Sequence, residues 1–489
     1  MARTSTMKEA SKAGMGHLSG NYINGEWVRE RGDGEVIVRD KYHGTELARL
    51  PKAPATLMEK AIEAAHASTT ALRKLSAADR SHALEEVARR IEGQRELFAR
   101  TIMQEAGKPI GYARNEVERA LVTVRTAAAE ALRLSGESVA LDFGKGVGRT
   151  AFTKRVPVGV VAAITPFNFP LNLVLHKVAP AMAAGCPVVL KPALATPLSA
   201  LMLAEIINAV DWPKGAFNVL LCDNNVAESL VKDERVAMLS FTGSDTVGWY
   251  LKGISGKKKV ALELGGNAAV IIDEGTGLHA AAKEVAMGAN LYAGQTCIST
   301  QRIFAVQPVF NEFRDLLAKE FEALKAGDPA DPEVSVGPII DGKHFLRIRE
   351  WLDEAVKGGA QVLTGGHVVD TAHHVFAATL LTNTRKDMKV GRDEVFGPLT
   401  LIEPVKDFSE AIARVNDSRY GLQAGVYTNN LAHVKQAHDE LVVGAVIVNG
   451  TPGFRIDSMP YGGVKDSGMG REGVRYAMEE MTEPRLIVY

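Results

Sequence analysis

The sequence has little cysteine, no excess of either charge and no long apolar run, and each shortage excludes a class of protein. Three cysteines in 489 residues are too few for a disulfide framework. Lys and Arg number 57 against 58 Asp and Glu, a formal net charge of −1. No general field therefore attracts nucleic acid or an anionic membrane, and we expect neither as a partner.

Targeting and metal-binding signals are also missing. The longest apolar stretches, such as residues 178–190, are shorter than the roughly 18–20 residues that cross a bilayer. Residues 1–20 carry scattered charges and no apolar core of a signal peptide. No cysteine or histidine cluster has zinc-ligand spacing, and the 12 histidines are dispersed. We expect a cytoplasmic protein without a metal site.

What the sequence does contain is alternation of short β-branched runs with helix-length segments. Apolar runs at 158–165, 186–193, 217–221 and 236–243 are separated by helical patterns, among them 171–185 and 198–210. Strands that are apolar throughout and joined by helices indicate a parallel sheet covered on both faces. A helical region at 55–134 is predicted to cover one face of this sheet.

A second α/β series begins near Ala261 and includes RIFAV (302–306), a helix at 309–326 and GAVIVNG (444–450). We therefore predict an α/β fold with two lobes, each built on a parallel sheet, and a cleft between them. Residues 135–157 interrupt the first lobe as two short strands around a glycine-rich turn, which is typical of an arm that contacts a neighbouring subunit.

Two residues stand out as chemically active. Cys297, in GQTCIST, follows a predicted helix among small residues, and a thiolate is a strong nucleophile when its pKa is lowered or a base is near. Glu263, in ALELGGN, ends a strand before two glycines, where burial would raise its pKa and suit it to accept a proton. Read alone, each has a plain structural alternative, and we assign that alternative to Cys186 and Cys222.

Seven motifs in order decide between these interpretations. They are PFNFP (166–170), VVLKPA (188–193), FTGS (241–244), ELGGN (263–267), GQTC (294–297), EVFGPL (394–399) and YGGVKDSGMGREG (461–473). Together they resemble the aldehyde dehydrogenase superfamily over essentially the whole chain. The resemblance implies two Rossmann-like lobes: a dinucleotide-binding domain at 1–134 and 159–262, a catalytic domain at 263–470, and an oligomerisation arm at 135–158 and 471–489.

The resemblance also assigns catalytic roles. Cys297 attacks an aldehyde to give a thiohemiacetal, and hydride transfer to the nicotinamide leaves a thioester. The amide of Asn168 and the backbone N–H of Cys297 hold the oxyanion. Glu263 activates water to hydrolyse the thioester, and its presence implies release of a free acid, because members that transfer the acyl group to coenzyme A generally lack this Glu.

The cofactor expected from the resemblance is NAD or NADP. The positions assigned to it are Thr165, Pro166, Lys191, Gly243, Ser244, Gly248, Leu264, Glu394 and Phe396. NAD-preferring members usually have Glu three residues after the Lys, where this chain has Leu194. Loss of that carboxylate removes repulsion of a 2′-phosphate without creating a preference. NAD, NADP and dual use stay open, and we favour dual use.

The substrate is expected to be a small aldehyde, with an anionic group as one option. Arg114 and Arg455 lie in regions that line the substrate entrance in the family, where arginines grip phosphonate, phosphate or carboxylate in branches acting on phosphonoacetaldehyde, glyceraldehyde 3-phosphate or succinate semialdehyde. The alternative is structural ion pairs, of Arg114 with Glu118 and of Arg455 with Asp457.

Two other functions remain to be weighed. A cofactor-independent cysteine esterase or acyl-transferase would use Cys297 and Glu263 alone, and a non-catalytic scaffold would use neither. Retention of the cofactor motifs argues against both. The arm and the apolar C-terminal LIVY, an exposed strand in a monomer, predict a homodimer or homotetramer.

Overall fold

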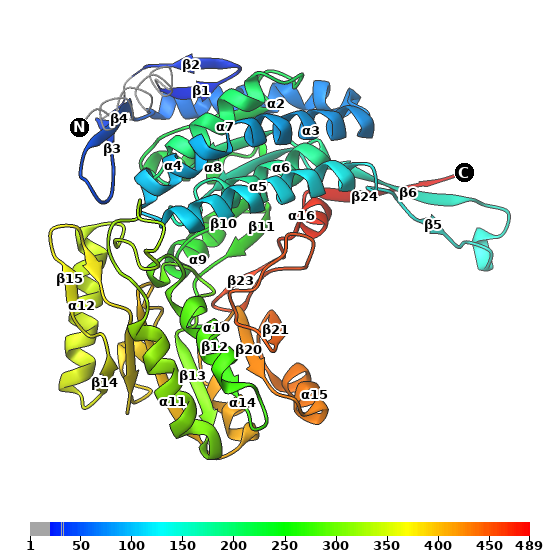
Figure 1. The fold of residues 1–489 in the computed structure, drawn as a ribbon. Coiled ribbons are helices and arrows are strands. Elements are labelled where there is room, and N and C mark those ends of the chain that lie inside the picture. Colours follow the sequence, from blue (N-terminus) through cyan, green and yellow to red (C-terminus); the bar gives the residue numbers. More distant parts are fainter. Residues whose placement is uncertain (1–19, 31, 33) are drawn as a thin grey trace.

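The computed structural model describes residues 20–489 apart from 31 and 33, so the segment without a signal-peptide core lies outside the described residues. Its two lobes lie one above the other in Figure 1, and an arm projects from the first lobe. No helix in the described part of the chain is long and apolar enough to cross a membrane.

The first lobe is built on an eight-stranded sheet whose central strands run parallel. Its order is β2 (Glu26–Val28), β1 (Asn21–Ile23), β9 (Phe217–Val219), β8 (Val188–Lys191), β7 (Val160–Ile164), β10 (Val236–Thr242), β11 (Lys259–Glu263) and β23 (Gly468–Met469). The chain runs outward from β7 to β8 and β9, then returns to add β10 and β11 on the other side. This reversal creates a ligand-binding crevice at the carboxyl ends of β7 and β10.

The second lobe has a seven-stranded sheet of the same kind. Its order is β14 (Gln361–Thr364), β17 (Thr379–Thr382), β18 (Leu399–Val405), β13 (Arg302–Val306), β12 (Ala269–Ile272), β20 (Gln423–Tyr427) and β21 (Ala445–Val448), with only the β14–β17 pair antiparallel. Around it lie α10 (Leu278–Asn290), α11 (Gln307–Glu322), α12 (Gly342–Lys357), α13 (Lys389–Arg392), α14 (Phe408–Asn416) and α15 (Leu431–Glu440). The expectation of two α/β lobes with parallel sheets is confirmed.

The N-terminal helices cover both faces of the first sheet, which corrects the prediction of one. They are α2 (Ala55–Lys74), α3 (Ala77–Gly93), α4 (Arg95–Ala106) and α5 (Ile110–Ala131). Helix α2 packs beside α8 (Asn224–Lys232) and α9 (Asp245–Ile254) on one face. On the other, α3 and α5 cover α6 (Asn172–Ala184), and α3 and α4 contact α7 (Leu198–Asn208).

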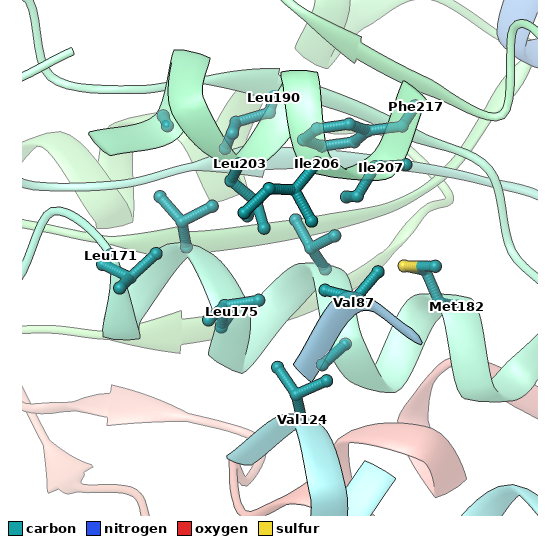
Figure 2. Packing of buried hydrophobic residues seen from close by; sticks show 14 of the residues in the cluster. Val87, Val124, Leu171, Leu175, Met182, Leu190, Leu203, Ile206, Ile207 and Phe217 are labelled. Atoms are coloured by element: carbon teal, nitrogen blue, oxygen red, sulfur yellow. The ribbon is translucent and has the colours of Figure 1, made fainter. Parts of the chain in front are cut away.

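The reason for this split lies in α6. Every residue of α6 is buried, so the helix cannot face solvent and needs a second layer of helices outside it. Figure 2 shows that layer: Val87 of α3 and Val124 of α5 point toward Leu175 and Met182 of α6. The sequence 171–185 is mostly apolar, with Asn172, His176 and Lys177 as its polar residues, and all three are buried.

The remaining elements form small sheets and the arm. Short pairs are β3 (Glu35–Arg39) with β4 (Glu46–Pro51), β15 (Val368–Asp370) with β16 (Val375–Phe376), and β19 (Tyr420–Gly421) with β22 (Val464–Lys465). In the arm, β6 (Ala151–Pro157) pairs with β5 (Ser138–Val139) and with the C-terminal β24 (Thr482–Val488) of the same chain. By contrast α16 (Val474–Glu480), predicted as part of the arm, packs on α5 and α6, and β23, predicted in the catalytic domain, extends the first sheet.

Candidate active site

The site forms where the two sheets meet. The first lobe contributes residues just after its strands: Pro166 follows β7, Gly243 follows β10 and Leu264 follows β11. The second lobe contributes residues just before its strands, because Cys297 precedes β13 and Phe396 precedes β18. The carboxyl ends of one sheet thus face the amino ends of the other.

A cavity of about 320 Å³ occupies this junction. The predicted residues that line it are Pro166, Asn168, Gly243, Ser244, Glu263, Leu264, Cys297, Glu394 and Phe396. Thr165, Lys191 and Gly248 lie next to the lining: Thr165 N donates to the Lys191 carbonyl over 3.2 Å, and Gly248 packs on Leu264. Most of the predicted catalytic and cofactor positions are therefore brought together.

Cys297 and Asn168 occupy the floor of this cavity. The Asn168 amide nitrogen donates to the Gln295 carbonyl over 3.0 Å, which fixes the orientation of the amide and leaves its second N–H available. Cys297 is partly exposed, and its Sγ lies 3.4 Å from the hydroxyl of Tyr461. Burial raises the pKa of the Cys297 thiol to about 12, whereas the Tyr461 hydrogen bond lowers it. Burial therefore favours the protonated thiol of Cys297.

Glu263 has the environment expected of a base held neutral until it is needed. Its carboxyl group is 5% exposed, and Oε2 has no hydrogen-bond partner. Burial, and then the nearby Glu472 carboxylate, raise the pKa of Glu263 well above its usual value. Glu472 is itself buried, but Lys177, His176 and Arg455 hold its pKa well below the usual range. The pair therefore divides into a neutral Glu263 and an ionised Glu472.

The cofactor side of the cavity is made of backbone. A Cβ on Gly243 would lie 2.6 Å from the Phe241 ring, and one on Gly248 would overlap the Leu264 side chain. Ser244 is the N-cap of helix α9 and makes no side-chain cap hydrogen bond, and in the first turn Thr246 N–H donates to Asp245 Oδ1 over 2.7 Å. These glycines bring a helix N-terminus close to the space, which fits a pyrophosphate.

Glu394 and Phe396 close the same side from the second lobe. Glu394 Oε1 accepts from Gly266 N over 2.9 Å, and a Cβ on Gly265 would lie 2.5 Å from Oε2. Burial raises the pKa of Glu394 to about 7. Phe396 holds a left-handed backbone, φ 49°, and its ring meets Phe167 edge to face at 5.8 Å. A carboxylate and an aromatic face at the cavity are suited to ribose hydroxyls and a flat ring, so the residues present fit NAD(P).

Lys191 is the cationic group at the far end of the cofactor side. Burial lowers its pKa, while Asp223 opposes that effect. Asp223 bonds Lys52 over 2.8 Å, so a second cation lies nearby. Leu194 is partly buried and packs against the helical core of the first lobe. No carboxylate therefore comes from the position where NAD-preferring relatives carry one.

The two arginines of the substrate hypothesis lie in different places. Arg114 is on the outer face of α5, 53% exposed, and bonds Glu96 through two nitrogens at 2.9 and 3.0 Å, rather than Glu118 as the structural alternative supposed. Arg455 is 5% exposed and bonds Glu472 over 2.9 Å, not Asp457. Arg455 also stacks on the Tyr461 ring at 3.6 Å, and through Tyr461 it adjoins Cys297.

Arg119, rather than Arg114, is the α5 arginine that approaches Arg455. It is turned about 140° around the helix from Arg114, since five residues advance by that angle. Its guanidinium lies 3.5 Å from Asp457, and burial, then the charge of Arg455, lower its pKa. Nε of Arg119 and Nε of Arg455 are both buried without a hydrogen-bond partner. Arg119 was not predicted from the sequence, because an arginine in an amphipathic helix is expected to be exposed to solvent.

Four more residues near the nucleophile were missed. They are Tyr461, His176, Lys177 and Glu472. His176 Nε2 lies 2.7 Å from Asp457, and Lys177 Nζ donates to Glu472 over 3.0 Å. The available signal was a His and a Lys inside the otherwise mostly apolar stretch 171–185, because a buried charged side chain needs a partner. Among the described residues no group of three or more possible metal ligands is present.

Comparisons with known proteins agree with this geometry. The model of the aldehyde dehydrogenase family matches residues 27–487, and the chain belongs to that family. A 3-sulfolactaldehyde dehydrogenase of Priestia aryabhattai is 44% identical over 471 residues, covering 96% of this chain and 97% of that protein. A lactaldehyde dehydrogenase of Methanococcus maripaludis is 37% identical over 96% of this chain and 99% of its own length.

A solved structure is similar throughout. Aldehyde dehydrogenase 21 of Physcomitrella patens, in complex with its reaction product succinate, has a TM-score of 0.93 and 38% identity over 96% of this chain and 98% of its own. The protein is an NAD(P)-dependent oxidoreductase that converts an aldehyde to the carboxylic acid. The esterase and scaffold alternatives are thereby set aside.

Proposed function

We propose that Cys297, Asn168 and Glu263 carry the chemistry. The Cys297 sulfur bonds the aldehyde carbon, and the carbonyl oxygen becomes an oxyanion that accepts hydrogen bonds from Asn168 Nδ2 and Cys297 N–H. NAD(P)⁺ held beside Ser244 and Glu394 would supply the hydride acceptor for that carbon, and Cys297 would then carry the acyl group as a thioester. Glu263 in its ionised form accepts a proton from the water that attacks the thioester, and the acid leaves as the sulfur is released.

The cofactor would lie along the glycine-built side of the cavity. Its pyrophosphate would meet the start of α9 at Ser244, and the nicotinamide ribose would meet Glu394. For the adenine ribose we propose dual use of NAD and NADP, with Lys191 as the cation available to a 2′-phosphate and Lys52 held in an ion pair with Asp223. Leu194→Glu should reduce kcat/KM for NADP about tenfold or more relative to NAD. A wild-type preference of about a hundredfold for NAD would contradict dual use.

We propose that the aldehyde carries an acidic group, a carboxylate, sulfonate or phosphonate. The observation that supports this is the pair of buried, unpartnered Nε atoms on Arg119 and Arg455 beside the Tyr461–Cys297 contact. An unpaired buried donor costs about 1–3 kcal/mol, and an anion would satisfy both. The 3-sulfolactaldehyde named for one relative and the succinate bound to another are compounds of this kind.

A matched panel of aldehydes and variants tests the substrate class. Succinate semialdehyde, 3-sulfolactaldehyde and phosphonoacetaldehyde would be compared with uncharged lactaldehyde and butanal, using Cys297→Ala as the blank. Arg455→Met and Arg119→Met should each lower kcat/KM for the anionic aldehydes about tenfold to a hundredfold and change the uncharged ones little. Arg114→Met is the control, with the same side chain on the same helix as Arg119. Wild-type preference for uncharged or long-chain aldehydes would contradict the proposal.

We further propose a cytoplasmic homodimer or homotetramer. The three cysteines are unpaired, in keeping with a reducing compartment. On the arm, Leu486, Ile487 and Val488 of β24 are exposed, and Figure 1 shows this strand projecting from the body of the molecule. Exposed apolar strands favour pairing with another chain. Leu486→Lys should lower the mass measured by light scattering, and a wild-type monomer would refute assembly.

A further inference from the structure

The hydroxyl of Tyr461 has one hydrogen-bond partner among the described residues, the sulfur of Cys297. The distance is 3.4 Å, within hydrogen-bond range for sulfur, and Tyr461 is 2% exposed. Its ring packs with Ile298 and Leu422 in a small apolar cluster that also touches Cys297. A buried tyrosine hydroxyl normally has a hydrogen-bond partner, and here the partner is the proposed nucleophile.

The ring is held so that its hydroxyl cannot turn away. The backbone of Tyr461 exchanges two hydrogen bonds with Glu472, at 3.0 and 2.7 Å. The Arg455 guanidinium lies 3.6 Å above the ring centroid, on the face that attracts cations. Arg455 is fixed in turn by its ion pair with Glu472. These contacts keep the hydroxyl directed at the sulfur.

The surroundings of Cys297 otherwise oppose its ionisation. Burial is the largest effect that raises its pKa, and the Glu394 and Glu263 carboxyl groups raise it further. Arg455 and the Tyr461 hydroxyl are the groups that lower it. Burial also raises the pKa of Tyr461 well above 10, so the phenol keeps its proton and acts as a donor. Of these groups, the Tyr461 hydroxyl is the one in direct contact with the sulfur.

We propose that Tyr461 is a catalytic residue whose hydroxyl donates a hydrogen bond to the Cys297 thiolate. This inference rests on the proposed role of Cys297 as the nucleophile. Tyr461 exchanges no proton in the reaction. It stabilises the thiolate before attack on the aldehyde, when the thiol proton has left for water, and again when the thiolate departs from the thioester. The hydroxyl should therefore assist both halves of the cycle.

Tyr461→Phe isolates this effect, because it removes the hydroxyl and keeps the ring under Arg455. A hydrogen bond to a charged group of ordinary strength corresponds to a shift of about one to two pKa units. In Tyr461→Phe a smaller fraction of Cys297 is thiolate at a given pH, but that thiolate is more basic and therefore a stronger nucleophile, which offsets part of the loss. Inactivation by iodoacetamide at fixed pH should therefore slow about threefold to tenfold. The pH limb of that reaction should move to higher pH, and the first-turnover burst of reduced cofactor should slow.

The controls separate the role of Tyr461 from the proposed role of Cys297 as the nucleophile. Tyr22→Phe removes another buried hydroxyl, which bonds Asn208 in the first lobe, and should leave both readouts unchanged. Cofactor titration and the thermal unfolding midpoint confirm that each variant is folded. If Cys297→Ala keeps its turnover, the nucleophile assignment itself fails. If Cys297→Ala is inactive but Tyr461→Phe matches wild type within about twofold in both readouts, only the role of Tyr461 is overturned.

Discussion

On the cofactor side of Cys297 the surface is made of backbone and glycines, whereas on the side of Tyr461 it is made of buried charged side chains. Gly243, Gly248 and Gly265 leave space where any side chain would collide. Arg455, Glu472 and their neighbours instead balance one another's charge inside the protein. Under the proposed assignment, one side would recognise the shape shared by all dinucleotides, and the other would recognise the charge of a particular substrate.

The difference extends to what each side tolerates. The glycine-lined cofactor side should bind its ligand less well when a side chain is added there, with little change in pH dependence. A buried charge cluster fails when one partner is removed, because the remaining charge is left uncompensated, and its failure appears as a shifted pH profile. Substitutions on the two sides should therefore differ in whether they change cofactor binding or the pH profile.

Glu263→Gln should have the largest effect, since it removes the proposed base between the two sides. The first turnover should still release reduced cofactor in a burst, because attack and hydride transfer do not need the water-activating group. Steady-state turnover should fall by about 10²- to 10⁴-fold. Stopped-flow measurement of the absorbance of the reduced nicotinamide follows both phases. An unchanged steady-state rate would remove Glu263 from the mechanism.

Glu472→Gln should move the pH dependence of thioester hydrolysis. The Glu472 charge raises the pKa of Glu263, so its removal lowers that pKa, and the basic form of Glu263 becomes available at lower pH. The acidic limb of the rate should move down by about one unit. Asp457→Asn is the matched control, a buried acid bonded to His176 rather than placed beside Glu263. Equal shifts in both variants would contradict the assigned pair.

Gly248→Ala and Gly253→Ala add the same methyl group to the same helix, α9. At Gly248 the methyl overlaps Leu264, whereas at Gly253 it meets nothing within 4 Å. Gly248→Ala should raise KM for the cofactor about tenfold, because α9 must shift away from the pyrophosphate. Gly253→Ala should leave KM unchanged and stabilise the helix by about 0.5–1 kcal/mol. Similar KM values for the two variants would show that α9 does not approach the cofactor closely.

More of the residues that line the cavity were named from the sequence on the glycine-built side than on the side of Tyr461, and the reason is local. Lys191, Gly243 and Glu263 lie in short motifs at strand ends, where spacing within a few residues carries the geometry. RIFAV is a strand at 302–306 as predicted. The substrate side joins α5, α6 and a C-terminal loop, and such an assembly leaves no pattern of spacing in the chain.

Glu472 illustrates that limit. It lies in SGMGREG, which contains the letters of a dinucleotide fingerprint but not its strand–turn–helix setting, and the segment offers no sign of a partner for Lys177. Arg114 and Arg119 lie on different faces of α5, and the burial of α5 shows that Arg119 is the one turned inward. Helix facing could be inferred from α5 alone, but the location of Arg455 could not.

The most direct test of the contrast between the two sides is equilibrium binding of both ligand types to one variant. Isothermal titration would compare succinate and NADP⁺ binding to wild type and Arg455→Met. In Arg455→Met, succinate binding should weaken about tenfold or more, while cofactor binding should stay within about twofold of wild type. Succinate binding that is unchanged, or cofactor binding that weakens equally, would contradict the assignment of the anion to Arg455.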